Sequence, residues 1–232
     1  MEKDKEKKKF KAVMLIPIAG ILIGIALLMI PVISNHINNE KNSKAISSMT
    51  AEYDKYADNP EVIEEYLEQA KAFNAQLAGE ETGDENVWDY EKQLSFDGDG
   101  VMAYIEIPKI NLKMLIYHGT SDEVLAVGAG HLEGTSLPVG GMSTHWVITA
   151  HSGMKTMKAF DDLRQIEVGD RFTVTTLGTS YEYEIESIET VLPYETESLG
   201  IVEGEDKVTL VTCTPYGIND HRLLVHGVRI ED

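Results

Sequence analysis

A stretch near the carboxyl end, TLVTCTPYGINDHRLLVHG (residues 209–227), decides the fold. Its first five residues are rich in threonine, valine and leucine, which predicts a strand that ends at Cys213. Residues 214–220 combine proline, glycine, asparagine and aspartate and predict a turn, and a second apolar run begins at Arg222. If the two strands pair across this turn, Cys213 and Arg222 lie near the same end of adjacent strands, where opposite Cβ atoms are about 4.5–5.5 Å apart.

The same two-residue periodicity extends upstream as far as Val101. Short runs of valine, isoleucine, threonine and tyrosine alternate with glycine, proline or aspartate, as expected of roughly seven or eight short strands. The predicted strands are Val101–Ile107, Leu112–Tyr117, His145–Ala150, Arg171–Thr176, Tyr181–Ile188, Lys207–Thr212 and Arg222–Ile230. So many strands with little helix between them predict a mainly β domain, an antiparallel barrel or sandwich, over residues 97–232.

The amino-terminal end has the pattern of a membrane anchor. Residues 1–11 carry six lysines, and residues 12–34, AVMLIPIAGILIGIALLMIPVIS, carry no charge. A helix of that length, at about 1.5 Å per residue, spans the ~30 Å hydrocarbon layer. The sequence predicts an uncleaved transmembrane signal anchor, a cytoplasmic tail and an extracellular remainder. Gly20 and Gly24 form a lone G-x-x-x-G, a pattern that is common by chance in membrane helices, so the oligomeric state stays open.

Residues 35–96 are predicted to be an extracellular helical segment followed by a linker. Asn59-Pro60-Glu61 has the N-cap, first-turn proline and acidic residue that begin a new helix. Two helices are therefore expected, each packing an apolar face on the next domain. The predicted faces are Ile46, Met49, Tyr53 and Tyr56, then Val62, Tyr66, Ala70, Phe73 and Leu77. Residues 79–96 are acidic and read as a linker, in which Trp88 and Tyr90 stand out.

Composition excludes several kinds of function. The formal charge of −19 leaves no basic face for nucleic acid, so no nucleic-acid partner is expected. One cysteine forms neither an intramolecular disulfide nor a multi-cysteine metal site. His118, His131 and His145 lack the partner motifs of zinc sites and are expected to be structural. The prediction is a protein without a metal or other cofactor.

Three residues have the chemistry of nucleophilic catalysis. A guanidinium at Arg222 beside a thiol at Cys213 lowers the thiol pKa and supplies donors to an oxyanion. His151 follows a predicted strand directly, where an imidazole can exchange protons with a cleft. The same pattern also fits a buried cysteine, a surface arginine and a structural histidine, so spacing alone leaves both interpretations open.

Longer motifs add a family resemblance. Thr209-Leu-Val-Thr-Cys213 resembles the T-L-x-T-C signature of sortases, the membrane-anchored cysteine transpeptidases of Gram-positive bacteria. Four segments resemble class C sortases, the pilus polymerases: residues 209–227, YIEIPKINLKMLIYHGTS (104–121), GHLEGTSLPVGG (130–141) and ITAHSG (148–153). The resemblance implies a closed β-barrel of about eight strands, preceded by a transmembrane helix and a two-helix segment.

The resemblance also implies roles for individual residues. Cys213 corresponds to the nucleophile, His151 to the acid–base and Arg222 to the stabiliser of the oxyanion; Thr212 is expected to help shape the groove floor. The implied substrates are an LPXTG-like sorting signal and a lysine amine of another pilin. Residues 80–90, EETGDENVWDY, lack the Asp-Pro-aromatic lid tripeptide usual in class C, which leaves Trp88 as a candidate lid or groove aromatic. The alternatives are a cell-wall anchoring sortase, whose acceptor is a peptidoglycan-peptide amine, and a non-catalytic peptide-binding barrel.

Overall fold

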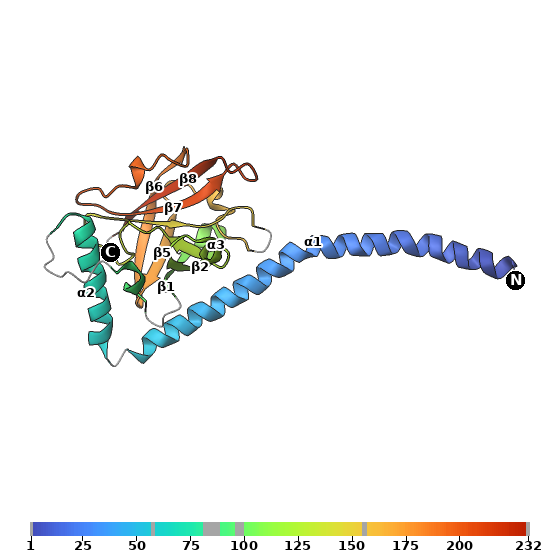
Figure 1. Ribbon diagram of the computed structural model, residues 1–232, viewed down its shortest axis with the longest axis horizontal. Coiled ribbons are helices and arrows are strands. Elements are labelled where there is room, and N and C mark those ends of the chain that lie inside the picture. Colours follow the sequence, from blue (N-terminus) through green and yellow to red (C-terminus); the bar gives the residue numbers. More distant parts are fainter. Residues whose placement is uncertain (1, 57–58, 81–88, 96–99, 155–156, 231–232) are drawn as a thin grey trace.

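The carboxyl-terminal part of the chain is a closed barrel (Figure 1). The computed structural model describes residues 2–56, 59–80, 89–95, 100–154 and 157–230. Around the barrel the strands follow the order β1-β2-β3-β4-β7-β8-β6-β5. Their bounds are β1 Val101–Ile107, β2 Leu112–His118, β3 Ala129–His131, β4 Thr144–Thr149, β5 Arg171–Thr176, β6 Thr179–Val191, β7 Asp206–Thr214 and β8 His221–Arg229. The predicted barrel is confirmed, and each strand expected from the sequence is present to within three residues at either end.

Two features of the sheet differ from the expectation of a purely antiparallel barrel. The pairs β2–β3 and β4–β7 are parallel. Strand β3 was not expected, because its three residues are all buried and are too few to show an alternating pattern. The β4–β7 pair matters for function, because parallel neighbours bring their carboxyl ends to the same end of the sheet.

Three helices and four 3₁₀ turns complete the part of the chain that the structure describes. The helices are α1 Glu2–Lys55, α2 Pro60–Leu77 and α3 Asp122–Leu125. The turns are η1 Tyr90–Lys92, η2 Pro108–Ile110, η3 Leu163–Gln165 and η4 Glu197–Leu199. Pro60 opens α2 after Asn59, as the sequence predicted.

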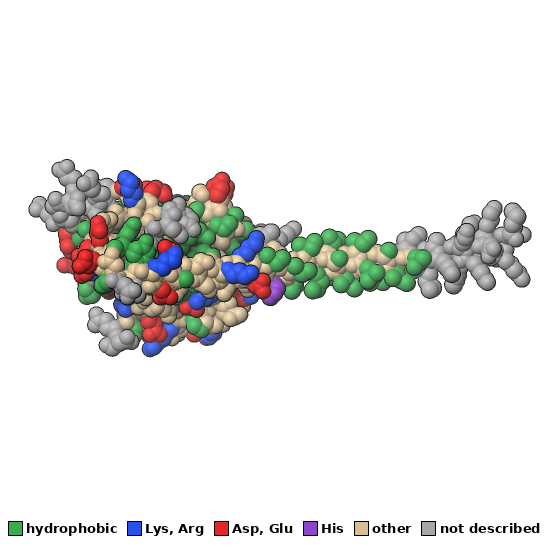
Figure 2. All heavy atoms as spheres, turned by 90° about the horizontal axis from the view of Figure 1, so that it is seen from below, with side chains coloured by type: hydrophobic (Ala, Val, Ile, Leu, Met, Phe, Trp, Pro, Cys, Tyr) green, Lys and Arg blue, Asp and Glu red, His purple; other side chains and the backbone are tan. Residues whose placement is uncertain are grey.

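Helix α1 joins two elements that the sequence analysis treated separately. The anchor predicted over residues 12–34 and the first helix of the following segment form one continuous helix of 54 residues, so residue 34 is not a structural boundary. Residues 35–55 are themselves helical in pattern, and the helix continues past Pro31 although that residue cannot donate to the hydrogen-bond ladder. Among the described residues, Pro17–Lys55 is the one stretch long and apolar enough to cross a membrane, with a mean hydropathy of 2.4 in its most apolar window. The part of this helix that extends beyond the barrel is covered with apolar side chains (Figure 2).

The end of α1 and all of α2 pack on the barrel, as predicted. Ile46 and Tyr53 of α1 and Ala70 and Phe73 of α2 are buried, and α1 contacts β2. Asn74 of α2 joins the helix to the barrel directly. Its Nδ2 donates to the carbonyl oxygen of Leu137 over 3.0 Å, and the Leu137 amide donates back to Asn74 Oδ1 over 2.6 Å.

The described part of the linker is more ordered than expected. Residues 89–95 contain η1, and Tyr90 and Leu94 are buried. The Tyr90 hydroxyl accepts from the Gly119 amide and lies 2.9 Å from His131 Nδ1, which ties this segment to β3. Apart from this three-residue turn, residues 89–95 form neither helix nor strand, so the segment is a loop that Tyr90 and Leu94 pack against the barrel. Trp88 lies outside the described residues.

Alternation along β7 decides which side chains can reach a substrate. Val208 and Leu210 belong to the barrel core. Thr209, Val211 and Cys213 therefore project from the opposite, outer face. On β8, Leu223 and Val225 point into the core, so Arg222, Leu224 and His226 share the outer face with Cys213.

Candidate active site

The thiol and the guanidinium lie opposite each other on paired strands. Strands β7 and β8 are antiparallel, and Cys213 is the direct partner of Arg222 in their register. Since both project outward, their Cβ atoms are about 4.5–5.5 Å apart. Cys213 is a free, half-buried cysteine. The pairing expected from the sequence is confirmed.

The third residue, His151, comes from the neighbouring parallel strand. Thr149 of β4 is the register partner of Val211, and the Ala150 amide donates to the Val211 carbonyl over 3.1 Å. His151 lies two residues after Thr149, and Cys213 lies two residues after Val211, the register partner of Thr149. The carboxyl ends of β4 and β7 therefore bring the imidazole and the thiol to the same end of the barrel, beside Arg222.

Two hydroxyl groups fix the peptides on either side of His151. Thr212 Oγ1 donates to the Ala150 carbonyl over 2.8 Å, and Ser152 Oγ donates to the Cys213 carbonyl over 2.7 Å. Residues 150 and 152 are thus each bonded to β7, which leaves His151 between two fixed points. Thr212 is buried on the face opposite Cys213, so it supports the groove from behind.

The loop after His151 folds back on itself. The Phe160 amide donates to the His151 carbonyl over 3.0 Å. The Asp161 carboxylate accepts from the Gly153 amide over 3.0 Å and from the Ala159 amide over 3.2 Å. These backbone hydrogen bonds hold both sides of the loop. They therefore position His151 through its backbone and do not require a hydrogen bond to its side chain.

Arg222 is held by the turn that it follows. Its Nη1 donates to the His221 carbonyl over 3.0 Å and to the Asn219 carbonyl over 3.3 Å. Within the described part of the chain the guanidinium forms no ion pair with a carboxylate, so its charge remains available to an anion beside Cys213. Asn219 adopts a positive φ of 63°, which an asparagine tolerates, and this turn aims the start of β8.

Residues that sequence reasoning missed line the same end of the barrel. Tyr216 and Ile218 of the turn are exposed, by 58% and 69%. A Cβ on Gly153 would lie 3.3 Å from the Tyr216 ring, and the Arg164 guanidinium lies 5.7 Å from the ring centroid. Tyr216 therefore reaches across to the loop after His151. The only signal in the sequence was a pair of apolar residues within a turn, where polar residues are usual.

The three histidines expected to be structural have structural partners. His118 bonds to the Gly100 and Gln93 carbonyls, and His131 bonds to the Ser136 carbonyl and to Tyr90. Complete burial lowers the pKa of His131 to about 4. Burial also lowers the pKa of His145, whose Nδ1 donates to the Gly200 carbonyl. Among the described residues, no cluster of three or more histidine, cysteine or acidic side chains has the geometry of a metal site.

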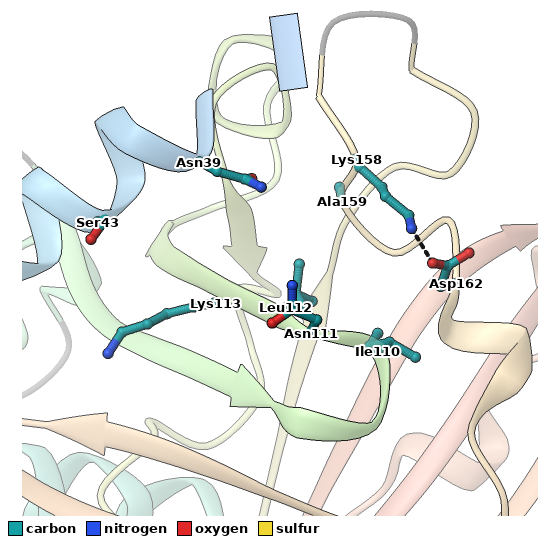
Figure 3. Close-up of a pocket in the computed structure, with 9 residues that line it drawn as sticks. All are labelled: Asn39, Ser43, Ile110, Asn111, Leu112, Lys113, Lys158, Ala159 and Asp162. Carbon is teal, nitrogen blue, oxygen red and sulfur yellow. Dashed lines mark ion pairs between the residues drawn. The ribbon is translucent and has the colours of Figure 1, made fainter. Parts of the chain in front are cut away.

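A separate cavity of about 420 Å³ lies between α1 and the barrel. Figure 3 shows Asn39 and Ser43 of α1 facing the β1–β2 turn, with Lys158 and Asp162 of the β4–β5 loop forming an ion pair at one side. Cys213, His151 and Arg222 are not among its lining residues. We therefore assign the chemistry to the end of β7 rather than to this cavity.

Comparison with known proteins decides the family. A family model described as the sortase domain matches residues 105–230, which is more than half of the chain. The chain belongs to the sortase family. Among curated sortases, it is 26% identical to sortase A of Bacillus anthracis over 57% of this chain and 61% of that protein. It is also 26% identical to sortase D of Bacillus subtilis, over 76% of this chain and 88% of that one. The match to B. anthracis sortase A therefore spans about three-fifths of that relative.

Solved structures of sortases support the class C resemblance. Sortase C-1 of Actinomyces oris is 45% identical, with a TM-score of 0.67, over 73% of this chain and 99% of that chain. Sortase C1 of Streptococcus agalactiae is 43% identical, with a TM-score of 0.75, over 82% of this chain and 99% of that chain. These identities exceed the 26–28% found with the curated sortase A proteins. A solved sortase A of Corynebacterium diphtheriae, a lid mutant, is also similar, at 38% identity and a TM-score of 0.69 over 75% of this chain and 96% of that chain. The class C assignment made from motifs is confirmed.

Proposed function

We propose that this sortase is a membrane-anchored cysteine transpeptidase that joins pilin subunits. The observation that carries the proposal is the convergence of Cys213, Arg222 and the loop of His151 at the carboxyl ends of β4 and β7. Peptide binding alone requires no thiol, imidazole and guanidinium together. The class C neighbours support the pilin as substrate.

The reaction begins with attack by the Cys213 thiolate on the carbonyl carbon after the threonine of an LPXTG-like sorting signal. A tetrahedral oxyanion forms, and the Arg222 guanidinium stabilises its charge. The carbon–nitrogen bond breaks as His151, in its imidazolium form, donates a proton to the leaving amine. The product of this half-reaction is a thioacyl enzyme.

The second half-reaction transfers the acyl group to an amine. The ε-amine of a lysine on another pilin attacks the thioester, His151 accepts the proton that the amine loses, and the Cys213 thiolate leaves. The new bond is an isopeptide bond between subunits. A peptidoglycan-peptide amine in place of lysine would anchor the protein to the cell wall, and water would release it.

A fluorogenic LPXTG-type peptide tests the chemistry. We expect the full chain in detergent micelles to cleave the peptide and the Cys213→Ala variant to lose cleavage by about 10⁴-fold or more, as for other removed nucleophiles. Mass spectrometry of a quenched reaction should show the acyl group on Cys213. Tight binding of the peptide by both proteins, without cleavage by either, would leave the binding-barrel alternative.

The product in cells separates polymerisation from cell-wall anchoring. Cells with the intact enzyme are expected to make a covalent pilin ladder that survives boiling in detergent. Loss of the enzyme should abolish the ladder. If the ladder persists and monomeric surface proteins appear in the medium instead, the acceptor is a cell-wall amine.

A further inference from the structure

A row of buried polar side chains lies on the outer face of the barrel, away from the three catalytic residues. His145, Thr209 and His226 belong to β4, β7 and β8, and all three are buried. His145 Nε2 lies 2.7 Å from Thr209 Oγ1, and Thr209 Oγ1 lies 2.8 Å from His226 Nδ1. One hydroxyl therefore bridges two imidazoles.

The outer end of each imidazole also has a partner. His145 Nδ1 lies 2.8 Å from the Gly200 carbonyl, and His226 Nε2 lies 3.1 Å from Glu189 Oε1. A carbonyl and a carboxylate only accept, so both of these ring nitrogens carry a proton. In a neutral imidazole the other nitrogen is then a bare lone pair.

Counting protons shows that two neutral imidazoles do not satisfy the row. Both would turn lone pairs toward Thr209, whose hydroxyl has one proton and can donate to only one of them. The other contact would bring two lone pairs together at hydrogen-bond distance. One additional proton, on either imidazole, satisfies every contact in the row.

Surrounding charges favour His226 as the residue that holds this proton. Burial, with repulsion from His226 and Lys207, lowers the pKa of His145. A hydrogen bond from Ser198, together with His226, lowers the pKa of Glu189, which is therefore an anion beside His226. Lys207 is itself paired with Glu186 and Glu205, so the acids nearest to it are already neutralised.

The row holds the loop between β6 and β7, residues 192–205. Gly200 accepts from His145, and Ser198 bonds to Glu189, which bonds to His226. The loop leaves β6 at Val191, whose register partner on β8 is Arg222. It returns to β7 at Asp206, the end of that strand far from Cys213, so it crosses the outer face from the catalytic end.

We propose that His145, Thr209 and His226 form a buried chain that holds one proton more than it would with both imidazoles neutral. This proton completes the hydrogen bonds that fasten the β6–β7 loop beside the catalytic groove. These are positioning residues, because they act on the substrate through the loop. The effect on peptide binding rests on the proposed function, whereas the extra proton and the fastened loop do not. As pH rises and the proton leaves, one link of the chain is lost and the loop loosens.

Nuclear magnetic resonance and hydrogen exchange test the chain without any catalysis. In the full chain in detergent micelles, labelled with ¹⁵N at histidine, His145 and His226 together are expected to carry three ring protons, one more than two neutral imidazoles. Protection factors for amides of residues 192–205, corrected for intrinsic exchange, are expected to fall as the extra proton is lost. Two neutral imidazoles at pH 7, or loop protection that stays unchanged when the proton leaves, would overturn the proposal.

Variants separate the charge from the mere presence of a side chain. His226→Arg supplies N–H donors and a charge that does not titrate, so loop protection should persist and lose its pH dependence. His226→Gln should reduce protection at every pH. Thr209→Val removes the bridging hydroxyl and should do the same, whereas Thr209→Ser should restore protection. His36→Gln, which replaces an exposed histidine of α1, is the matched control and should behave as the parent.

Kinetics link the chain to the groove. His226→Gln is expected to raise KM for the sorting peptide by about fivefold, the ratio that corresponds to about 1 kcal/mol, with kcat nearly unchanged. If loop protection follows the proton but no peptide is cleaved by the parent, the proposed function fails and the positioning chain stands. If the parent cleaves peptide and the loop ignores the proton, only the chain is refuted.

Discussion

Single hydroxyl groups set the position of His151, the proposed general acid–base. Ser152 and Thr212 bond the peptides on either side of His151 to the strand that carries Cys213. Both are common residues, and nothing in their local sequence marks them. Their role depends on β4 and β7 being parallel neighbours, which places the two carboxyl ends together.

The hydroxyl of Ser152 is expected to matter more for activity than for stability. Ser152→Ala removes its bond to the Cys213 carbonyl and should cost about 1 kcal/mol of unfolding free energy. Because a small displacement of a catalytic group is amplified in the rate, kcat/KM should fall by about tenfold or more. Ser180→Ala is the control, since it removes a 2.9 Å bond to Thr175 on the β5–β6 hairpin. An equal loss of kcat/KM in both variants would contradict the assignment.

Gly153 combines a backbone requirement with a close contact. It has a φ of +87°, and a Cβ there would approach the Tyr216 ring to 3.3 Å. Gly134 has the same φ of +87°, with nothing within 4 Å of its Cβ position. Alanine at either site should cost about 1–2 kcal/mol of backbone strain. Only Gly153→Ala should also lower peptide cleavage, because only this substitution displaces Tyr216. Equal activity in the two variants would show that Tyr216 does not contribute to peptide cleavage.

At the scale of elements, packing on the barrel gives the helical segment its order. Periodicity predicted the buried faces of α1 and α2 correctly, because each face repeats within one helix. It did not predict η1 or the burial of Leu94, since that segment has no repeating pattern. Tyr90 is an aromatic residue of the linker that packs on the barrel, and its ring lies edge-on to His118 with the ring centroids 5.1 Å apart.

Asn74 supplies the polar part of the attachment of α2, beside the buried Ala70 and Phe73. Asn74→Ala leaves the Leu137 amide buried without its partner, whereas the Leu137 carbonyl still accepts from the Val139 amide, so the unfolding free energy should fall by about 1–3 kcal/mol. Urea unfolding, followed by tryptophan fluorescence, measures this. Gln69→Ala on the exposed face of α2 removes only a 3.4 Å contact with Glu65 and should change stability by less than about 0.5 kcal/mol. A loss of the same size from Gln69→Ala would show that α2 itself, and not its attachment, is affected.

At the scale of the molecule, the apolar span and the proposed catalytic residues lie in separate parts, α1 and the barrel. Figure 1 shows the long helix extending away from the barrel, with the amino terminus at its far end. The lysines of residues 1–11 favour a cytoplasmic tail, which would place Cys213 outside the cell. This orientation is a prediction from charge.

The lone cysteine makes that orientation measurable. A membrane-impermeant maleimide is expected to label Cys213 in intact protoplasts, because the half-buried thiol faces the extracellular groove. In a Cys213→Ala background, a Lys5→Cys variant should be labelled only after lysis. The reverse pattern would place the barrel in the cytoplasm and end the proposal of a surface transpeptidase. Deletion of residues 81–88 should leave the labelling rate unchanged; a large acceleration would reveal a lid.

Seven of the eight described strands, the apolar span and the pairing of Cys213 with Arg222 were predictable from the sequence alone. Each of these depends on residues close together in the chain, where side-chain alternation or a short turn makes the structure visible in the pattern. The parallel pairing of β4 with β7 and the burial of Tyr90 became evident only in the three-dimensional structure. Those features depend on contacts between segments that are far apart in the chain. The periodicity of one segment does not indicate which other segment it will pack against.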